Sequence, residues 1–414
     1  MLIAVDGGSW ANVRGFGRFT RDLVRALAAA RSDARLALLV DPKTATRDDF
    51  PDGVERVVVD VRTPPSEAAS AEGARSLRDL FAFRRACARL APDVVYYPAV
   101  YTYFPAPGRV PAAVTFHDAI AEKLPQLVFP TRRGRFFWRL KCRAAARRAA
   151  RVVTVSEASR RDVAAAYGLD PAALLTVPEG VDRTVFHPRR DAGEAAEERA
   201  RLGLGATEPF FLAVGGLAPH KNLDRLLRAA GILRRARPDR AFRLVLVGGG
   251  SGDVFHSDRA RLEDVARREG VADVAVFAGY LPDARLAAFY RAAHALVFPS
   301  LLEGFGLPAL EAMACGTLVA CSNAGSLPEV TGDAGLFFDP TSCDDLAAAL
   351  ARALDDDALR ALRSAAGLER SRLFTWERAA EILHAEFRRL AGRPVDDGSA
   401  AMIAGRRRSP DPAP

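Results

Sequence analysis

The stretch Phe298-Pro-Ser-Leu-Leu-Glu-Gly-Phe-Gly-Leu-Pro-Ala-Leu-Glu311 places two carboxylates, Glu303 and Glu311, around a glycine-containing loop that follows a short apolar run. Pro308 suits the first turn of a helix, so Phe305 to Pro308 predict a loop that enters a helix N-terminus. The free N–H groups of such a terminus suit a phosphate or sugar hydroxyls. We therefore expect Glu303 in the loop and Glu311 about one turn into the helix, both reaching one cleft. Taken alone, the pattern also fits an ordinary strand-to-helix turn with a capping carboxylate.

Short apolar runs alternate along the chain with segments of helical period that are rich in alanine, leucine and arginine. This alternation is typical of βαβ units and predicts an α/β fold with parallel sheets. In the first half we predict strands at Leu2–Val5, Leu36–Val40, Val57–Val61, Val94–Tyr97, Val114–Phe116, Val152–Val155 and Leu174–Val177. In the second half we predict strands at Phe210–Val214, Leu244–Val247, Val274–Phe277, Leu296–Phe298 and Leu318–Ala320.

Polar and glycine clusters directly follow these predicted strands. In the first half they are Asp6-Gly7-Gly8, His117-Asp118, Ser156-Glu157 and Glu179-Gly180. In the second half they are Gly215-Gly216, Gly248-Gly249-Gly250, Gly279-Tyr280 and the segment Ser300–Gly306. Ligands of open parallel sheets bind at the carboxyl ends of the strands. We therefore predict two Rossmann-like parallel-sheet domains that face a central cleft.

The predicted domain boundaries follow from breaks in this pattern. We place an N-terminal domain at residues 1–188 and a C-terminal domain at residues 189–375, with the polar stretch 189–201 as a hinge region. A helix at 376–392 is expected to cross back to the N-terminal domain. Residues 393–414 are rich in proline, glycine, alanine and charge, and we expect them to form a disordered tail.

The composition excludes several classes of protein. The 414 residues suffice for two to three domains, and 49% hydrophobic with 27% charged residues is typical of a soluble globular chain. No apolar run reaches the roughly 18 residues that a membrane span needs. The N-terminal run Met1–Asp6 has a strand pattern instead of a leader pattern, so we expect a cytoplasmic protein. Five cysteines without a C-x-x-C pair argue against a zinc site and a disulfide framework.

The net charge of +8 would suit a nucleic-acid partner, but its make-up argues against one. Of the 59 basic residues 55 are arginine, and the four lysines are Lys43, Lys123, Lys141 and Lys221. Together with the abundant alanine, this bias indicates a GC-rich genome. No basic motif with interleaved aromatics accompanies the charge, so we expect no nucleic-acid partner.

The motifs taken together resemble the retaining glycosyltransferases of family 4, which have the GT-B fold of two Rossmann-like domains. Phe298–Glu311 is similar to that family's E-x7-E motif, and Ala312–Thr317 with Leu327–Val330 to its continuation. The other matching segments are Arg14–Arg18, Thr115–Asp118, Val153–Glu157, Gly180–Asp182, Gly215–Asn222 and Gly279–Asp283. The resemblance covers about residues 1 to 390 and implies an N-terminal acceptor-binding domain and a C-terminal nucleotide-sugar-binding domain.

The resemblance implies transfer of a hexose, with retention at the anomeric carbon, from a nucleotide diphosphate sugar to a hydroxyl. By this resemblance His117, Glu303 and Lys221 are catalytic: Lys221 meets the diphosphate, and Glu303 the donor sugar. Glu311 is expected to hold the nucleotide ribose. The implied donor-binding residues are Gly15, Gly17, Gly216, His220, Lys221, Gly248, Tyr280, Leu281, Glu303, Gly304, Phe305, Gly306, Leu307 and Glu311. A packing role for His117, and a surface position for Lys221 at the start of a helix, are the alternatives.

The departing nucleoside diphosphate carries two to three negative charges, so cations and N–H donors should dominate the site. No isolated Asp-x-Asp follows a predicted strand, which favours diphosphate binding without a metal, and we expect no cofactor besides the GDP- or UDP-linked donor. Many family members carry arginines near Gly216 and at the position of His220, and this chain lacks both. Arg14 or Arg18 would compensate for them. No residue stands out as a covalent nucleophile, so we favour front-face departure and attack.

The segment Thr131–Arg151 contains nine basic residues around an apolar cluster of Phe136, Phe137, Trp138 and Leu140. A basic amphipathic helix of this kind can lie on anionic lipid, which would suit a lipid-linked acceptor at the inner face of the cell membrane. The alternative is a solvated helix whose aromatic side chains pack in the core of the N-terminal domain.

The sequence favours a hexosyltransferase of polysaccharide or glycolipid biosynthesis with a saccharide or lipid-linked acceptor. The Pro219-His-Lys-Asn222 context resembles that of mannosyl- and related transferases of envelope polysaccharides, and this resemblance favours GDP-mannose over a UDP-sugar. A non-catalytic nucleotide-sugar-binding partner of the same fold is the first alternative, because the two arginines are absent. A nicotinamide-dependent oxidoreductase is the second, although Gly248-Gly-Gly-Ser-Gly252 lacks the G-x-G-x-x-G spacing.

Overall fold

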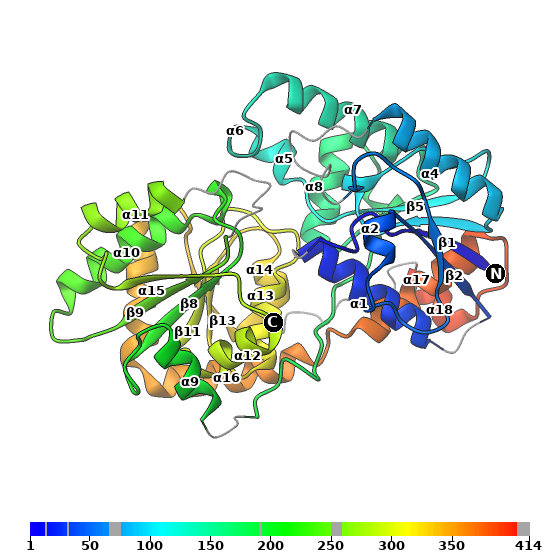
Figure 1. The fold of residues 1–414 in the computed structure, drawn as a ribbon. Coiled ribbons are helices and arrows are strands. Elements are labelled where there is room, and N and C mark those ends of the chain that lie inside the picture. Colours follow the sequence, from blue (N-terminus) through cyan, green and yellow to red (C-terminus); the bar gives the residue numbers. More distant parts are fainter. Residues whose placement is uncertain (13–14, 31–32, 66–75, 190–192, 250–258, 404–414) are drawn as a thin grey trace. The chain divides into compact units, whose positions relative to one another are not determined.

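The computed structural model describes residues 1–12, 15–30, 33–65, 76–189, 193–249 and 259–403. Within these ranges the chain forms two compact units, each built around its own parallel sheet (Figure 1). Of the described residues, unit 1 comprises Met1–Gly180 together with Thr375–Ile403, and unit 2 comprises Val181–Phe374. The predicted α/β class with two Rossmann-like parallel-sheet domains is confirmed.

Unit 1 contains a seven-stranded sheet of order β3-β2-β1-β4-β5-β6-β7 in which every pairing is parallel. Its strands are β1 (Leu2–Asp6), β2 (Arg35–Val40), β3 (Glu55–Val58), β4 (Val94–Tyr97), β5 (Ala112–Phe116), β6 (Arg151–Thr154) and β7 (Leu175–Thr176). The central strands β1, β4 and β5 are almost wholly buried. Strands that are covered on both faces read as continuous apolar runs, which is why the sequence predicts them well. The run predicted at Val57–Val61 begins earlier, as β3.

Two layers of helices cover this sheet. The helices of unit 1 are α1 (Gly15–Ala29), α2 (Pro42–Ala45), α4 (Leu77–Leu90), α5 (Ile120–Lys123), α6 (Pro125–Val128), α7 (Arg132–Arg148), α8 (Glu157–Tyr167), α17 (Trp376–Leu390) and α18 (Asp397–Ile403). One apolar cluster joins α4, α7 and α8 to the sheet through Phe83, Cys142 and Val163. The C-terminal α17 packs beside α1, as the orange and blue helices in Figure 1 show.

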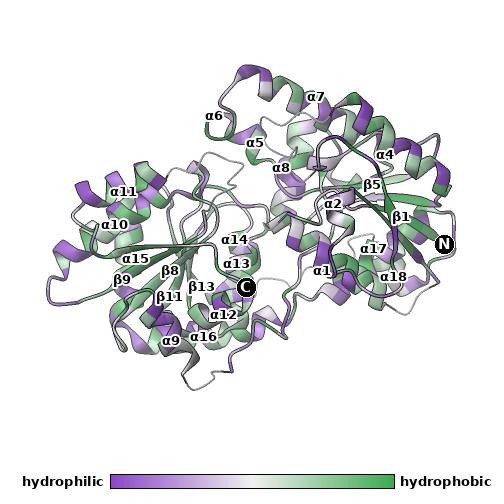
Figure 2. Ribbon diagram, viewed as in Figure 1, coloured by the Kyte–Doolittle hydropathy of each residue, from purple (hydrophilic) through white to green (hydrophobic). Residues whose placement is uncertain are grey.

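Unit 2 contains a six-stranded parallel sheet of order β10-β9-β8-β11-β12-β13. Its strands are β8 (Phe210–Val214), β9 (Arg243–Val247), β10 (Ala275–Gly279), β11 (Ala295–Phe298), β12 (Val319–Ser322) and β13 (Gly335–Phe338). Figure 2 shows the hydrophobic character of the strands in both units. The sequence prediction missed β13, an edge strand that starts at a glycine after a turn-prone segment and leaves Phe337 39% exposed.

The helices of unit 2 are α9 (Glu194–Arg201), α10 (Leu223–Ala236), α11 (Arg259–Arg268), α12 (Asp283–Ala292), α13 (Leu307–Ala314), α14 (Leu327–Thr331), α15 (Cys343–Asp355) and α16 (Asp357–Ser371). The predicted hinge at 189–201 is wrong for its helical part, because α9 packs on α12. Glu198 of α9 is buried, and its carboxylate lies 2.7 Å from both Arg285 and Arg201. A segment fixed by a buried carboxylate belongs to the folded unit.

The chain leaves unit 1 after Gly180 and re-enters it at Thr375, and these two points lie in contact. A Cβ placed on Gly180 would come within 2.3 Å of the backbone nitrogen of Trp376 and 2.6 Å of the carbonyl carbon of Thr375. Only glycine fits this close approach. The structure thus divides the chain at Gly180 and Val181, before the boundary predicted at residue 188, and assigns α17 to unit 1.

The tail predicted as disordered over 393–414 is partly wrong, because residues 397–403 form α18. The helix starts with local hydrogen bonds from Ser399 to the Asp396 carboxylate, and it packs against α17. Residues 404–414 lie outside the described residues. Among the helices in the described ranges, none has both the length and the apolar composition of a membrane span.

A buried ion pair holds α17 against the sheet of unit 1. Glu386 is fully buried, and its Oε1 accepts a hydrogen bond of 2.7 Å from Nε of Arg151 at the start of β6. Arg389, one turn further along α17, donates to the same carboxylate at 2.6 and 2.9 Å. Two guanidinium groups therefore satisfy one carboxylate that has no access to water.

We expect Glu386→Ala to lower the free energy of unfolding of unit 1 by about 3 kcal/mol, because it leaves the half-buried Arg151 guanidinium without a carboxylate. The three tryptophans of the chain, Trp10, Trp138 and Trp376, all belong to unit 1, so their fluorescence in urea reports unfolding of that unit. Glu381→Ala, an exposed site on the same helix, should change the free energy by less than about 0.5 kcal/mol. Equal losses in the two variants would contradict this account.

Candidate active site

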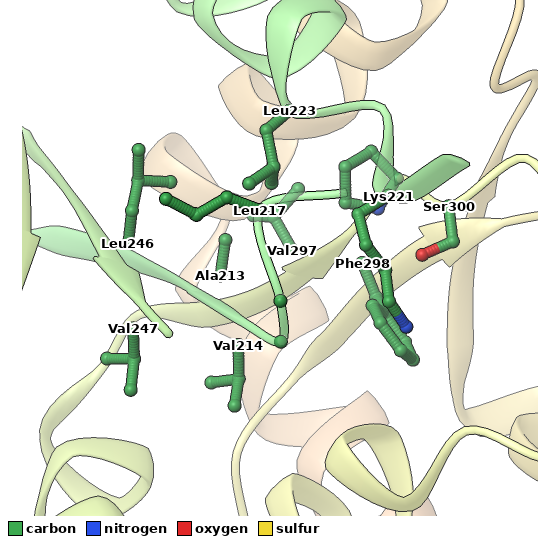
Figure 3. Close-up of a pocket in the computed structure, with 13 residues that line it drawn as sticks. Ala213, Val214, Leu217, Lys221, Leu223, Leu246, Val247, Val297, Phe298 and Ser300 are labelled. Carbon is green, nitrogen blue, oxygen red and sulfur yellow. The ribbon is translucent and has the colours of Figure 1, made fainter. Parts of the chain in front are cut away.

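The last residues of three strands of unit 2 and the turns that follow two of them line a pocket at the carboxyl edge of its sheet. The pocket lies at the ends of β8, β9 and β11, and Figure 3 shows the side chains around it. Its lining residues are Ala213, Val214, Gly215, Gly216, Leu217, Lys221, Leu223, Leu246, Val247, Val297, Phe298, Pro299 and Ser300. This is the edge at which open parallel sheets bind their ligands.

The glycine turns after β8 and β9 touch each other. Gly248 has φ +132°, and a Cβ there would lie 1.7 Å from the carbonyl oxygen of Gly215. The Gly248 N–H donates to the carbonyl of Gly279 at the end of β10, and the Gly215 N–H donates to the carbonyl of Val247 at the end of β9. Three strand ends are therefore linked by backbone contacts that no side chain could enter.

Lys221 lies above this turn because Asn222 fixes its backbone. Pro219–Lys221 form a short 3-10 turn, and Asn222 then adopts a left-handed conformation with φ 60° at the start of α10. The Asn222 side chain is buried and donates to the carbonyls of Pro299, at 2.9 Å, and Pro340, at 2.8 Å. The sequence prediction missed this role of Asn222, although its position directly after the lysine was a signal.

The ammonium of Lys221 and the carboxylate of Glu303 form an ion pair. Nζ lies 2.6 Å from Oε1, and the side chains are 20% and 10% exposed. Nζ also lies 5.5 Å from the centroid of the Phe298 ring. The structure thus brings together two of the three predicted catalytic residues, from segments 82 positions apart in the chain.

The Glu303 loop is held in turn by the start of α14. Ser326 Oγ donates to the carbonyls of Glu303, at 3.2 Å, and Phe305, at 2.7 Å. Gly325 has φ +63°, and a Cβ on it would lie 3.0 Å from both the backbone nitrogen and the carbonyl oxygen of Glu303. The sequence prediction missed Ser326, because its partners lie more than twenty positions earlier in the chain.

The loop enters α13 as predicted. The helix begins at Leu307 with Pro308 in its first turn, and Gly306 precedes it with φ +109°. Glu311 lies one turn into the helix, as expected, but it is 2% exposed and accepts a 3.0 Å hydrogen bond from the Tyr290 hydroxyl of α12. Tyr290 lies within α12 and gave no signal in the sequence. The ribose contact of Glu311 stays a prediction.

His220 and Ser300 present polar atoms that no protein group satisfies. Within the described part of the chain, Nδ1 of His220 and Oγ of Ser300 are buried and have no hydrogen-bond partner. Burial, and secondly the Lys221 charge, lower the pKa of His220 to about 4. The imidazole is therefore neutral at pH 7, so of these groups Lys221 supplies the positive charge.

The next turn, after β10, carries the predicted base-binding residues. Tyr280 is 58% exposed, whereas Leu281 is buried with 4% exposure. Gly279 before them has φ +68°. A tyrosine ring left in solvent beside the glycine turns is available to a flat ligand.

The remaining predicted residues, His117, Gly15 and Gly17, belong to unit 1. His117 follows β5, and its Nε2 lies 2.9 Å from the carbonyl oxygen of Pro98. Its Nδ1 lies 3.4 Å from Oε1 of Glu179, a residue to which the sequence gave no site role. Gly17 in the first turn of α1 has no room for a side chain, because a Cβ would lie 1.9 Å from the carbonyl oxygen of Asn12. Arg14 lies outside the described residues.

Two family descriptions match the chain: "Glycosyltransferase Family 4" over residues 13–185 and "Glycosyl transferases group 1" over residues 194–370. O-antigen chain mannosyltransferase B of Escherichia coli is 32% identical over 375 residues, which cover 88% of this chain and 93% of that protein. The chain belongs to glycosyltransferase family 4. A D-inositol 3-phosphate glycosyltransferase of Acidothermus cellulolyticus is 37% identical to this glycosyltransferase over 235 residues, 56% of this chain and 51% of that protein.

Solved structures show that this family 4 glycosyltransferase has the GT-B fold. Sucrose-phosphate synthase from Thermosynechococcus elongatus has a TM-score of 0.70 at 24% identity, covering 95% of this chain and 99% of that one. HepE from Anabaena, solved in complex with UDP and glucose, has a TM-score of 0.70 at 19% identity, with coverages of 93% and 98%. At these identities the likeness concerns the fold alone. The family assignment replaces the oxidoreductase alternative.

We expect Gly248→Ala to destabilise unit 2 by more than about 2 kcal/mol, because its Cβ would collide with the Gly215 carbonyl and φ +132° is strained for alanine. Gly216→Ala is the matched control in the same pocket, since a Cβ there meets nothing within 4 Å. Differential scanning calorimetry of both variants tests this. A Gly248→Ala variant with the same unfolding temperature as the wild type would show that the two turns do not touch.

Proposed function

We propose that this glycosyltransferase moves a hexose from a nucleotide diphosphate sugar to an acceptor hydroxyl with retention at the anomeric carbon and without a metal. The observation that carries the proposal is the Lys221–Glu303 pair at the carboxyl edge of the unit 2 sheet. The pair supplies a cation for the diphosphate and a carboxylate for the hydroxyls of the sugar, 2.6 Å apart. In a nucleotide diphosphate sugar the diphosphate is joined directly to the sugar, so its binding site needs a cation and a hydrogen-bond acceptor at neighbouring positions.

Before the donor binds, Glu303 serves as the counter-charge of the Lys221 ammonium. A diphosphate is a stronger counter-charge than one carboxylate, so the donor takes over Lys221 and releases Glu303 toward the sugar. The unsatisfied Nδ1 of His220 and Oγ of Ser300 provide further partners for phosphate or sugar oxygens. As charge develops on the leaving diphosphate, Lys221 stabilises it without rearrangement of the site.

The attacking hydroxyl would arrive from the face that the diphosphate leaves, and His117 of unit 1 is the side chain that we propose for contact with the reacting sugars. The contact from Nε2 to the Pro98 carbonyl fixes the ring, and Nδ1 lies beside Glu179. A ring held in this way can orient a hydroxyl of the sugar or the acceptor. Glu311 in α13 is the proposed partner of the ribose.

Mannose is the sugar we propose, with GDP as its carrier. The support is the Escherichia coli relative, a mannosyltransferase that is 32% identical over 88% of this chain. That relative acts on the O-antigen chain, which favours a saccharide acceptor, and a lipid-linked saccharide is the second candidate. The UDP complex of HepE supports a nucleoside diphosphate in this fold at 19% identity.

The experiment is a thermal unfolding scan with GDP, UDP and ADP, followed by a transfer assay with the sugar donor of the base that binds. A ligand at 100 times its dissociation constant adds about 2.7 kcal/mol, a shift of roughly 5 to 10 °C for a unit of this size. We expect a shift with GDP, and transfer from GDP-mannose to a mannoside with an α-linked product by NMR. A β-linked product would contradict retention. A shift without transfer to any acceptor would favour the non-catalytic binding partner.

A further inference from the structure

The outer sides of α4 and α7 in unit 1 form one basic and apolar surface, which we call the α4/α7 face. α7 has the sequence RRGRFFWRLKCRAAARR and α4 the sequence LRDLFAFRRACARL. Their eleven arginines are all exposed. The single acidic residue of the two helices, Asp79, is 1% exposed and accepts a hydrogen bond from the Arg62 N–H. The exposed charges of these two helices are therefore all positive.

Within the described residues, none of the eleven arginines of α4 and α7 forms an ion pair. Many arginines elsewhere are paired with carboxylates, as Arg151 is with Glu386 and Arg285 with Glu198. Others, such as the exposed Arg228, are not. The set on α4 and α7 stands out because eleven such arginines lie on two helices with no exposed acidic residue between them. An anionic partner would explain this concentration.

Large apolar side chains project between these arginines. Phe136, Phe137 and Leu140 of α7 are 63%, 53% and 57% exposed, and Leu77 and Phe81 of α4 are 73% and 61% exposed. These five are half of the ten large hydrophobic side chains that are exposed in the described chain. Figure 2 shows hydrophobic and hydrophilic turns alternating along α7. The predicted packing of the aromatics in the core is wrong for Phe136 and Phe137.

The opposite side of α7 is held against unit 1, so the helix cannot rotate to bury its exposed apolar side chains. Trp138 is half-buried, and its Nε1 donates to Glu122 at 2.8 Å. Lys141 donates to the Tyr101 carbonyl at 3.1 Å and lies 4.4 Å from the centroid of the Trp138 ring. Cys142 beneath is fully buried. These contacts fix the rotation of the helix, so Phe136, Phe137 and Leu140 point to solvent.

Both helices belong to one layer. Phe83 and Cys87 of α4 and Cys142, Ala145 and Ala146 of α7 are buried in the same apolar cluster on one face of the sheet. Because both helices pack on the same face, their outer sides face the same way (Figure 1). An arginine-rich plane from which leucine and phenylalanine project matches the interface of an anionic bilayer, where the arginines meet phosphates and the apolar side chains enter the acyl boundary. Nucleic acid would use the arginines but offers no place for Leu77 and Leu140.

We propose that the α4/α7 face docks the enzyme on an anionic membrane surface. This surface lies in unit 1, on helices that carry none of the proposed catalytic or donor-binding residues. It would hold the enzyme at the bilayer plane, where an acceptor joined to a lipid is found. Docking is independent of donor chemistry and can be measured without turnover.

The test is co-sedimentation of the full chain with vesicles of phosphatidylcholine alone or mixed with phosphatidylglycerol. We expect binding to the mixed vesicles only, weakening as salt rises from about 0.1 to 1 M and the Debye length falls from about 10 to 3 Å. Each arginine near the surface contributes about a five-fold increase in partitioning, so Arg139→Gln with Arg143→Gln should weaken binding roughly 25-fold. Arg228→Gln, an exposed arginine in unit 2, is the matched control and should have no effect.

The apolar side chains are tested separately. Phe136→Ser with Phe137→Ser should reduce binding, whereas Leu362→Ser, a 66% exposed leucine in unit 2, should not. The emission of a Phe137→Trp variant should shift to the blue with mixed vesicles. Transfer to a soluble acceptor should stay unchanged in these variants. Absence of binding to mixed vesicles, equal binding to neutral vesicles, or equal losses in the control variants would overturn the proposal. Tight binding of an RNA oligonucleotide through the same arginines, without vesicle binding, would also overturn it.

Discussion

All strand pairings described in the two sheets are parallel, and this constraint determines where everything else can lie. Parallel strands need a crossover after each strand, and all their carboxyl ends meet at one edge. In unit 2 that edge gathers the turns after β8, β9, β10 and β11. The contact between Gly215 and Gly248 closes the edge so tightly that only backbone fits between two strands. Lys221 and Glu303 meet above this edge because the sheet brings their segments together.

The strands and the positions of the polar residues after them could be predicted from the sequence because both follow local patterns. Buried parallel strands are continuous apolar runs, and the carboxylates, glycines and lysine follow them directly. The helix at Leu307 was predicted from Pro308 in the same way. The edge strand β13 escaped prediction because an edge is covered less and begins here at a glycine. The sequence prediction missed α9 because a glutamate such as Glu198 in a polar hinge is expected to be a solvated charge. In the structure Glu198 is buried and forms an ion pair with Arg285.

The residues that hold the site in place could not be predicted, since their partners are remote. Asn222 donates to the carbonyls of Pro299 and Pro340, and Ser326 to those of Glu303 and Phe305. These bonds join segments that only the folded sheet brings together. The distribution of charge over the surface could not be predicted from the sequence either. A net charge of +8 does not say where the positive charge is concentrated, and only the folded helices α4 and α7 show that eleven exposed arginines lie on one side of unit 1.

The central claim is that Lys221 is the cation that meets the diphosphate of the donor. Isothermal titration calorimetry of GDP and guanosine with the wild type and with Lys221→Ala tests it most directly. Because Lys221→Ala also leaves the Glu303 carboxylate unpaired, the same substitution is made in a Glu303→Gln background, where no carboxylate can repel the diphosphate. A hydrogen bond to a charged group contributes about 1.5 to 3 kcal/mol. The account predicts that Lys221→Ala weakens GDP about 10- to 100-fold in both backgrounds and leaves guanosine unchanged. An equal effect on both ligands, or none on either, would contradict it.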